Sequence, residues 1–519
     1  MLVQEIFPVQ ERAFRVNVKD SRILRRCKRK IERRLARRTW TEQRRPMLAA
    51  RNIHYEMAER TRAIPCGGIG AFHLLAQQSG LVKAIDRSVR LLKRHLPYFE
   101  SDHVLNIAYN GLTGGTCLED IELRRNDATY LDAVGAQRIP DPTTEGDFTR
   151  RFTEEEVVAL MEATNAIRVK MWKKRLSREE RREGILDVDG TLAPTEGECK
   201  EGMGISYNGV WGYHPLGVSL ANTMEPLYLK NRPGNRPSHE GAAAWMDRAA
   251  GLVGQAFDRV TFRGDTDFSL TAHFDRWTGE GIRFAFGIDA RDPLVKIAEA
   301  LEIAGAFRPL RRPRERRGDG PARRKKERVK ERIVVEKGYE NVKLVSEEVA
   351  EGVYRPGRCG RDYRLVVVKK NLSVERGEHV LWEDIRCFFY ITNIEKMSTE
   401  EVVLFCHDRC NQENLIEQLK NGLNALRMPV GDLVSNWAYR VMASLGWTLK
   451  AWFALLVRDG ERREELLKME FRRFRHAVVD IPAQIVRAGR RIIYRLLGYN
   501  DWVGTLLRTF DRIAELRLT

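Results

Sequence analysis

The stretch that most constrains the fold of this chain is GILDVDGTLAPT at residues 184–195, where a short apolar run ends in two aspartates one residue apart. An apolar run of this length, followed by turn residues, is typical of a buried β-strand. Because side chains alternate between the two faces of a strand, Asp187 and Asp189 share a face. The end of this strand is therefore the first candidate for a catalytic site.

The segments around this strand predict the fold class. Runs of β type at 184–189, about 204–212 and 217–229 favour a three-stranded antiparallel meander. A helix capped by Ser238 should follow, and then a strand that ends at Asp265. A helix over 268–279, a strand over 282–288 and a helix over 292–304 would complete the layer. The order predicts an α/β fold with a mixed sheet and flanking helices.

The letters DVDGT admit two interpretations. They resemble the opening motif of the haloacid dehalogenase phosphatases, in which Asp187 would be the nucleophile and Asp189 the general acid. They also resemble the first catalytic strand of an RNase H-like transposase, in which a single aspartate at the strand end binds metal ions. A phosphatase would follow this strand with a cap element, whereas the chain continues with β-type runs and turns, which favours the second interpretation.

Charge narrows the class of partner. The net charge is +18, and the excess lies in residues 12–45, with fifteen Lys or Arg against three acids, and residues 308–332, with thirteen against four. Concentrated positive charge suits a protein that binds a polyanion, because each neutralised phosphate releases a counterion. A basic run can also be a solvated face or a linker. The candidate DNA contacts in these segments are Arg25, Arg29, Arg33, Arg311, Arg324 and Lys325.

A third acidic residue lies in CHDRCNQENLIEQLK at residues 406–420. In a helix, Arg409, Glu413 and Lys420 would share one face. A carboxylate between two cations is suited to a site that binds a metal ion together with a phosphodiester, because the carboxylate binds the metal and the cations bind the phosphodiester backbone. An ordinary surface stripe of helical salt bridges has the same spacing.

With these residues in place, the chain resembles a bacterial insertion-sequence transposase of the DDE type, in the branch with a Tyr-Arg-Glu-Lys signature. Arg409, Glu413 and Lys420 match that signature, and Cys406 stands at the tyrosine position. Further similar stretches are TTEGDFTRRF, LKNRPGN, FRGDTDFS and FFYITN, and the resemblance spans roughly residues 70–450.

The resemblance implies an RNase H-like core whose catalytic and metal-binding acids are Asp189, Asp265 and Glu413, with Asp187 as the alternate first ligand. Asp189 is preferred because the family's aspartate directly precedes a small residue, here Gly190. It further implies two Mg²⁺ ions, replaceable by Mn²⁺, and cut-and-paste cleavage and joining of the element's terminal repeats and target DNA, by way of a hairpin intermediate. A dimer is expected in the DNA complex. The alternatives are the phosphatase and a DNA-binding derivative without catalysis.

The expected organisation has six segments. A basic N-terminal helical arm (1–64) and a helical DNA-binding domain (65–180) precede the first part of the core (181–305). A basic strap and β-rich insertion (306–400), the second part of the core with the glutamate helix (401–460) and a basic helical C-terminal region (461–519) follow. The eight cysteines form no CxxC pair, and the sequence shows neither a signal region nor a bilayer-length apolar run. These features predict a cytoplasmic, nucleoid-associated protein without membrane contact.

Overall fold

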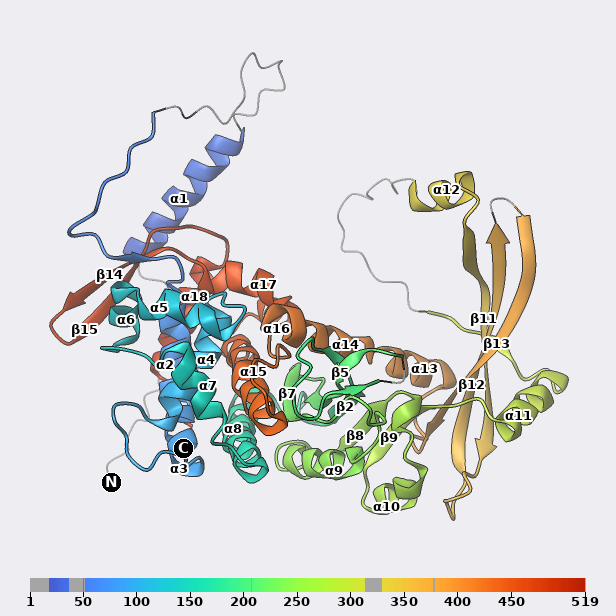
Figure 1. Ribbon diagram of the computed structural model, residues 1–519. Coiled ribbons are helices and arrows are strands. Elements are labelled where there is room, and N and C mark those ends of the chain that lie inside the picture. The colour runs from blue at the N-terminus through green and yellow to red at the C-terminus, as the bar shows by residue number, and fades with distance from the viewer. Residues whose placement is uncertain are drawn as a thin grey trace, which may run out of the picture. The chain divides into compact units, whose positions relative to one another are not determined.

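The computed structural model describes residues 18–36, 50, 52–206, 208–312, 329–376 and 379–518. The chain divides into two compact units, and Figure 1 labels the elements of both. Unit 1 consists of Met1–Leu176, Cys199–Glu201 and Glu417–Thr519, and unit 2 of Ser177–Glu198 and Gly202–Ile416.

Unit 2 contains a nine-stranded mixed sheet in the order β10-β11-β12-β13-β9-β8-β2-β6-β7. Strands β2, β8 and β9 are parallel to one another, and the other pairs are antiparallel. The mixed sheet that the sequence predicts is therefore confirmed. The strands are β2 (Gly184–Gly190), β6 (Leu216–Leu220), β7 (Glu225–Lys230), β8 (Val260–Gly264), β9 (Arg283–Ile288), β10 (Arg308–Pro309), β11 (Glu340–Tyr354), β12 (Tyr363–Arg376) and β13 (His379–Thr392).

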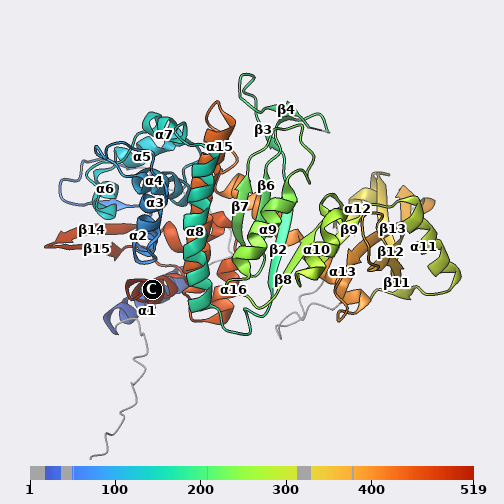
Figure 2. The ribbon, with the colours of Figure 1, turned by 90° about the horizontal axis from the view of Figure 1, so that it is seen from below.

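Helices cover both faces of this sheet. Helix α9 (Ala242–Val253) packs on β2, β6, β7 and β8, as Figure 2 shows from below. Gly184 allows this close approach, because a Cβ atom there would lie 2.3 Å from the Val253 side chain. Helix α13 (Thr399–His407) packs on β9, β11, β12 and β13. The remaining helices of unit 2 are α10 (Phe274–Gly279), α11 (Asp292–Ile303), α12 (Val329–Glu336) and most of α14 (Cys410–Glu417).

The predicted meander differs from the structure in its second and third strands. The run at 204–212 forms β4 (Gly204–Ile205) and β5 (Trp211–Tyr213), which join β3 (Ala193–Pro194) in a separate small sheet. The run at 217–229 is interrupted by a turn in which Met224 has a positive φ of 56°, so it yields both β6 and β7. The expected helix over 268–279 is also shorter, because 3-10 turns occupy residues 266–268 and 271–273 before α10 begins.

Strands β11, β12 and β13 confirm that the region behind the basic segment is rich in β structure. They pair antiparallel over nearly their full length, with a bulge at Val345 of β11 and another at Leu381 of β13. Near the sheet centre they are buried under α13, where Val349, Val366 and Val368 pack against Val402 and Val403. Toward the hairpin between β12 and β13, many of their side chains are exposed.

Unit 1 is mostly helical around α15 (Leu433–Leu455), whose side chains are almost all buried. Helices α2 (Ile69–Gln78), α4 (Glu100–Leu112), α7 (Pro142–Thr149), α8 (Glu154–Arg175) and α16 (Gly460–Lys468) pack against it. The other helices are α1 (Val18–Ala36), α3 (Leu81–Ser88), α5 (Ile121–Arg125), α6 (Ala128–Val134), α17 (Phe471–Phe474) and α18 (Val503–Ala514). No helix among the described residues combines the length and apolar character needed to cross a membrane.

Two expectations about the helices of unit 1 need correction. The amphipathic pattern of residues 81–96 predicts a helical segment, but α3 ends at Ser88 because Val89 is extended. The C-terminal region is not wholly helical: β14 (Ala483–Ala488) and β15 (Arg491–Leu496) form a hairpin that pairs with β1 (Ala63–Ile64). Adjacent β-branched residues in each strand, Ile485 and Val486 in β14 and Ile492 and Ile493 in β15, favour β structure, and Gly489, with φ of 59°, allows the turn between them.

Helix α1 spans the first part of the predicted basic helix, and residues 37–49 lie outside the described part of the chain. Leu24, Cys27 and Ile31 recur at helical spacing, which predicts a packed apolar stripe, but Ile31 is 41% exposed and Leu24 and Cys27 are only half-buried. The helix therefore has little core of its own.

Candidate active site

Two aspartates lie at matching positions on neighbouring parallel strands of unit 2. In the register of β2 and β8, Asp187 lies beside Arg263. Asp189 and Asp265 each follow two residues later, so they occupy equivalent places at the carboxyl ends of these strands. Side chains two residues apart point to the same face, which brings both carboxylates to the same side of the sheet.

Asp187 is engaged in a buried ion pair. Its two carboxylate oxygens accept hydrogen bonds from Arg263 Nε at 2.6 Å and Nη2 at 2.9 Å, and both side chains are at most 3% exposed. Arg263 Nη1 donates a third bond to the carbonyl of Phe405 in α13, at 2.8 Å. A carboxylate held in this way is not free to attack a substrate, so the geometry does not suit Asp187 as a nucleophile.

The third acid reaches the same place from a broken helix. The sequence predicts one helix through 406–420, but α13 ends at His407, a turn at 408–409 follows, and α14 begins at Cys410. Arg409 lies in that turn, and Glu413 lies in the first turn of α14. After α14 the chain continues in a π-helical turn, Gln418–Gly422.

Arg409 joins the three acids. Its Nη1 lies 3.1 Å from Asp189 Oδ2 and 3.7 Å from Asp265 Oδ2, and its Nη2 lies 2.9 Å from Glu413 Oε1. The side chains are partly accessible, from 14% for Asp189 to 54% for Glu413. One cationic group thus contacts one carboxylate from each of three elements.

Burial changes the proton affinity of these acids. It raises the pKa of Asp189 to about 7, against the opposing effect of Arg409. Burial likewise raises the pKa of Asp265, again opposed by Arg409. The thiol of Cys406, at the signature tyrosine position, is buried and its pKa is raised to about 12, so it is a poor nucleophile at neutral pH.

The donor set fits a hard divalent cation, because carboxylate oxygens are the ligands that Mg²⁺ and Mn²⁺ prefer. The spacing does not yet fit: among the described residues no three His, Cys, Asp or Glu side chains lie close enough to hold a metal ion together. The guanidinium of Arg409 occupies the position between the acids. A metal ion at this site would have to displace it.

A cavity of about 430 Å³ adjoins Asp265 and Arg409. Its wall includes Phe388 and Tyr390 of β13 and His407 of α13. His407 Nε2 lies 3.3 Å from the Tyr390 hydroxyl, and its buried Nδ1 has no hydrogen-bond partner among the described residues. Burial lowers the pKa of His407, so the ring is neutral at pH 7. The cavity offers aromatic surface and a polar nitrogen beside the acids.

The structure brings together some predicted site residues and not others. Asp189, Asp265, Arg409 and Glu413 meet, whereas Lys420 lies on the π-helical turn in unit 1. The exposed residues Arg25, Arg29 and Arg33 lie on one face of α1, and Arg311 is exposed after β10. Arg324 and Lys325 lie outside the described residues.

Sequence reasoning missed Arg263. The residue stands two positions before Asp265 just as Asp187 stands two before Asp189. An Arg and an Asp at equivalent places on two adjacent buried strands could have been recognised as a pair, but only once the strands were known to be neighbours and in register.

Comparisons with known proteins identify the family. The family model "Transposase DDE domain group 1" matches residues 65–518, which is most of the chain. Among solved structures, the chain is similar to the piggyBac transposase in its synaptic complex with hairpin DNA, with 10% identity, a TM-score of 0.34, and coverage of 79% of this chain and 81% of that one. A comparison with curated proteins found no match. The chain therefore belongs to the DDE transposases, enzymes that act on DNA.

Proposed function

We propose that the chain is the transposase of a bacterial insertion sequence, and that it cuts and joins DNA with Asp189, Asp265 and Glu413 as its catalytic acids. The observation that carries the proposal is the convergence of these carboxylates, from two adjacent strands and a helix, on the single cation of Arg409. The strand order β9-β8-β2-β6-β7, with β2, β8 and β9 parallel, is also what an RNase H-like core requires.

In this proposal Asp189, Asp265 and Glu413 would hold divalent metal ions, with Mg²⁺ as the ion in the cell because its preference for oxygen ligands matches these carboxylates. Such ions would activate water or a terminal 3′-hydroxyl and stabilise charge on the leaving oxygen. Arg409 leaves the acids and binds the scissile phosphate, for which its forked donors are suited. Lys420 would bind DNA phosphates as a point charge. The basic residues of α1 and Arg311 bind phosphates of the terminal repeats and target without reading sequence. A dimer would bring two ends together.

The test is cleavage of DNA that carries the element's terminal repeat. Asp189→Ala, Asp265→Ala and Glu413→Ala should each abolish Mg²⁺- or Mn²⁺-dependent nicking while DNA binding persists. The matched control is Asp289→Ala, because Asp289 follows the neighbouring strand β9 and lines the cavity, yet is not assigned to the triad. Near-normal nicking by Asp189→Ala would contradict the assignment.

A further inference from the structure

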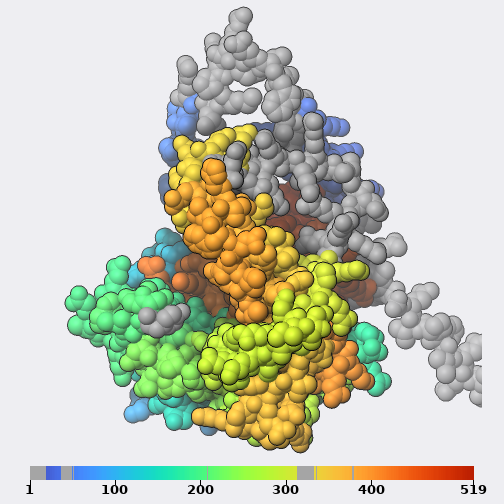
Figure 3. Space-filling model, turned by 90° about the vertical axis from the view of Figure 1, so that its right-hand side faces the viewer, coloured from blue at the N-terminus to red at the C-terminus, as the bar shows by residue number. Residues whose placement is uncertain are grey.

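Strands β11, β12 and β13 form a three-stranded arm, and its distal half exposes many apolar side chains. We define this distal half as residues 340–347 of β11, 370–376 of β12 and 379–388 of β13. On β13 these are Val380 at 58%, Leu381 at 40%, Trp382 at 54%, Ile385 at 65% and Phe388 at 42%. Large apolar side chains gathered on one strand mark an interaction surface more often than chance exposure. In Figure 3 the orange residues of this region lie at the surface of the face in view.

The outer edge of β13 is also open in the described part of the chain. Residues 389–392 pair with β9, but residues 379–388 pair with β12 alone. Their outward N–H and C=O groups therefore lack a strand partner. A long apolar strand edge of this kind pairs readily with another strand unless charge or a bulge prevents it.

Charge argues that the partner is protein rather than DNA. The distal half contains four basic and five acidic residues, a net charge of −1, in a chain of net charge +18. A surface that binds the phosphate backbone needs an excess of positive charge. This surface has none, although basic segments are plentiful elsewhere.

The sequence of the edge is complementary to itself. Two copies related by a two-fold axis pair antiparallel with the same faces aligned, so residue numbers opposite one another have an even sum. When Ile385 opposes its own copy, Asp384 opposes Arg386 twice and Trp382 opposes Phe388 twice. In the two neighbouring registers of the same parity, the centre of the pair moves by one residue. If it moves to Asp384, that residue opposes its own copy, and if it moves to Arg386, that residue opposes its own copy. Like charges directly opposite are unfavourable, whereas opposite charges and aromatic pairs are favourable.

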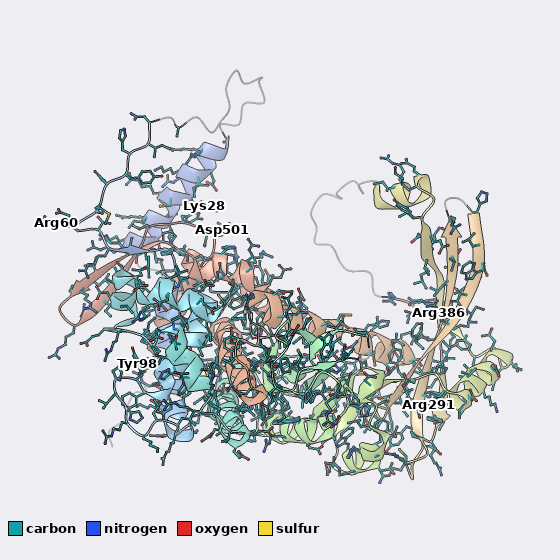
Figure 4. The ribbon with its side chains drawn as sticks, viewed as in Figure 1. Lys28, Arg60, Tyr98, Arg291, Arg386 and Asp501 are labelled. Carbon is teal, nitrogen blue, oxygen red and sulfur yellow. The ribbon has the colours of Figure 1, made fainter. Side chains whose placement is uncertain are left out.

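We propose that residues 382–388 of β13 form a two-fold antiparallel strand pair with the same residues of a second copy, centred on Ile385. Within one chain Arg386 Nε already donates a hydrogen bond to Asp384 Oδ2 at 2.7 Å, so the two side chains lie on one face, where the partner's pair would meet them. Figure 4 labels Arg386 on this strand. Phe388 also lines the cavity beside Asp265, so the pairing edge reaches the wall of that cavity. The proposal does not depend on the catalytic assignment, since it concerns the protein without DNA.

The test is the oligomeric state of the full chain without DNA, measured by sedimentation velocity from low to high micromolar concentration. The wild type should dimerise. Asp384→Arg alone opposes Arg to Arg, and Arg386→Asp alone opposes Asp to Asp, so each should raise the dimer dissociation constant by roughly tenfold or more. Mixing the two single variants should restore association as a heterodimer, because every opposed pair is then of opposite sign. That rescue also shows that both variants are folded.

The exposed Val353 on the proximal part of β11 provides a control, since Val353→Lys should leave dimerisation unchanged whereas Ile385→Lys should weaken it. A monomeric wild type, or single charge reversals that dimerise as the wild type does, would overturn the proposal. Failure of the mixed variants to associate would also overturn the register. None of these outcomes bears on the acids, which the cleavage assay tests separately.

Discussion

Replacing Arg409 with glutamine should strengthen metal binding while it weakens catalysis. In the structure the guanidinium stands between the three acids, with contacts of 3.1 Å to Asp189 and 2.9 Å to Glu413. A divalent cation must break these contacts before it can share the same oxygens. Arg409→Gln removes that competition, and it also removes a cation that would bind the scissile phosphate.

The size of the effect follows from the two short ion pairs. Each joins partly exposed groups, so each is worth about 0.5–1 kcal/mol rather than the larger value of a buried pair. Breaking both costs the metal-bound state about 1–2 kcal/mol. Arg409→Gln should therefore tighten binding of Mn²⁺, in the absence of DNA, by roughly 5- to 30-fold. The longer contact to Asp265, at 3.7 Å, adds little.

Isothermal titration of the full chain with Mn²⁺, supported by the electron paramagnetic resonance of the free ion, measures this affinity directly. Arg312→Gln is the matched control, because it removes the same charge from an ion pair with Glu347 and makes no contact with the three acids. Cleavage of terminal-repeat DNA should fall in Arg409→Gln and stay near normal in the control. If Arg409→Gln bound Mn²⁺ no more tightly than Arg312→Gln, the idea that the guanidinium occupies the metal position would be refuted.

Three further outcomes are expected. Asp187→Asn should lower the free energy of unfolding by about 3–5 kcal/mol in urea titrations, because it leaves Arg263 buried without its charged partner. Asp189→Asn at pH 8 should not destabilise the fold, and equal losses in the two variants would contradict the difference in their roles. Because the pKa of Asp189, about 7, exceeds its ordinary value of 3.8, the stability that this residue contributes is present below about pH 4 and is lost as the pH rises through 7. Since a proton on Asp189 competes with the metal ion, the affinity of the wild type for Mn²⁺ should fall about tenfold for each pH unit below 7. Replacing the three arginines on one face of α1 (Arg25, Arg29 and Arg33) with glutamine should reduce the salt dependence of DNA binding by a slope of roughly 0.9 for each phosphate that these side chains no longer neutralise, and an unchanged slope would exclude α1 from the DNA interface.

Local sequence patterns predicted the strands of the core well, because a short apolar run that ends in turn residues is compatible with few local structures other than a buried strand. Strand β9 and helix α11 lie within a residue or so of the expected bounds. The patterns failed where tertiary contacts decide. The run at 204–212 has β propensity, yet it pairs within a small separate sheet, and the amphipathic segment from residue 81 stops being helical at Val89.

The candidate site was predicted as a set of residue types and not as an arrangement. The acids at 189, 265 and 413 were chosen by resemblance, and their assignment to catalysis is a prediction still. The continuous helix through Arg409 and Lys420 was wrong, because the helix breaks at 408–409 and turns into a π-helical segment at 418. The spacing of residues cannot predict such breaks in a helix, because they depend on the tertiary contacts of the side chains.

The buried polar residues beneath the acids explain why this site needs both its strands and its broken helix. Asp187 of β2 lies beside Arg263 on one side and Ser219 of β6 on the other. Arg263 reaches the carbonyl of Phe405 near the end of α13, and Ser219 donates a hydrogen bond to Gln412 of α14.

These two links fasten α13 and α14 to the same row of the sheet, one on each side of the turn that carries Arg409. Asp189 stands two residues above that row, about 6–7 Å further along its strand, and Glu413 directly follows Gln412. The distance between the first and third acids is therefore set by a layer of buried groups, Asp187, Arg263, Ser219 and Gln412. Asp187 belongs to this layer, which explains how a motif with two aspartates can supply only one to the surface.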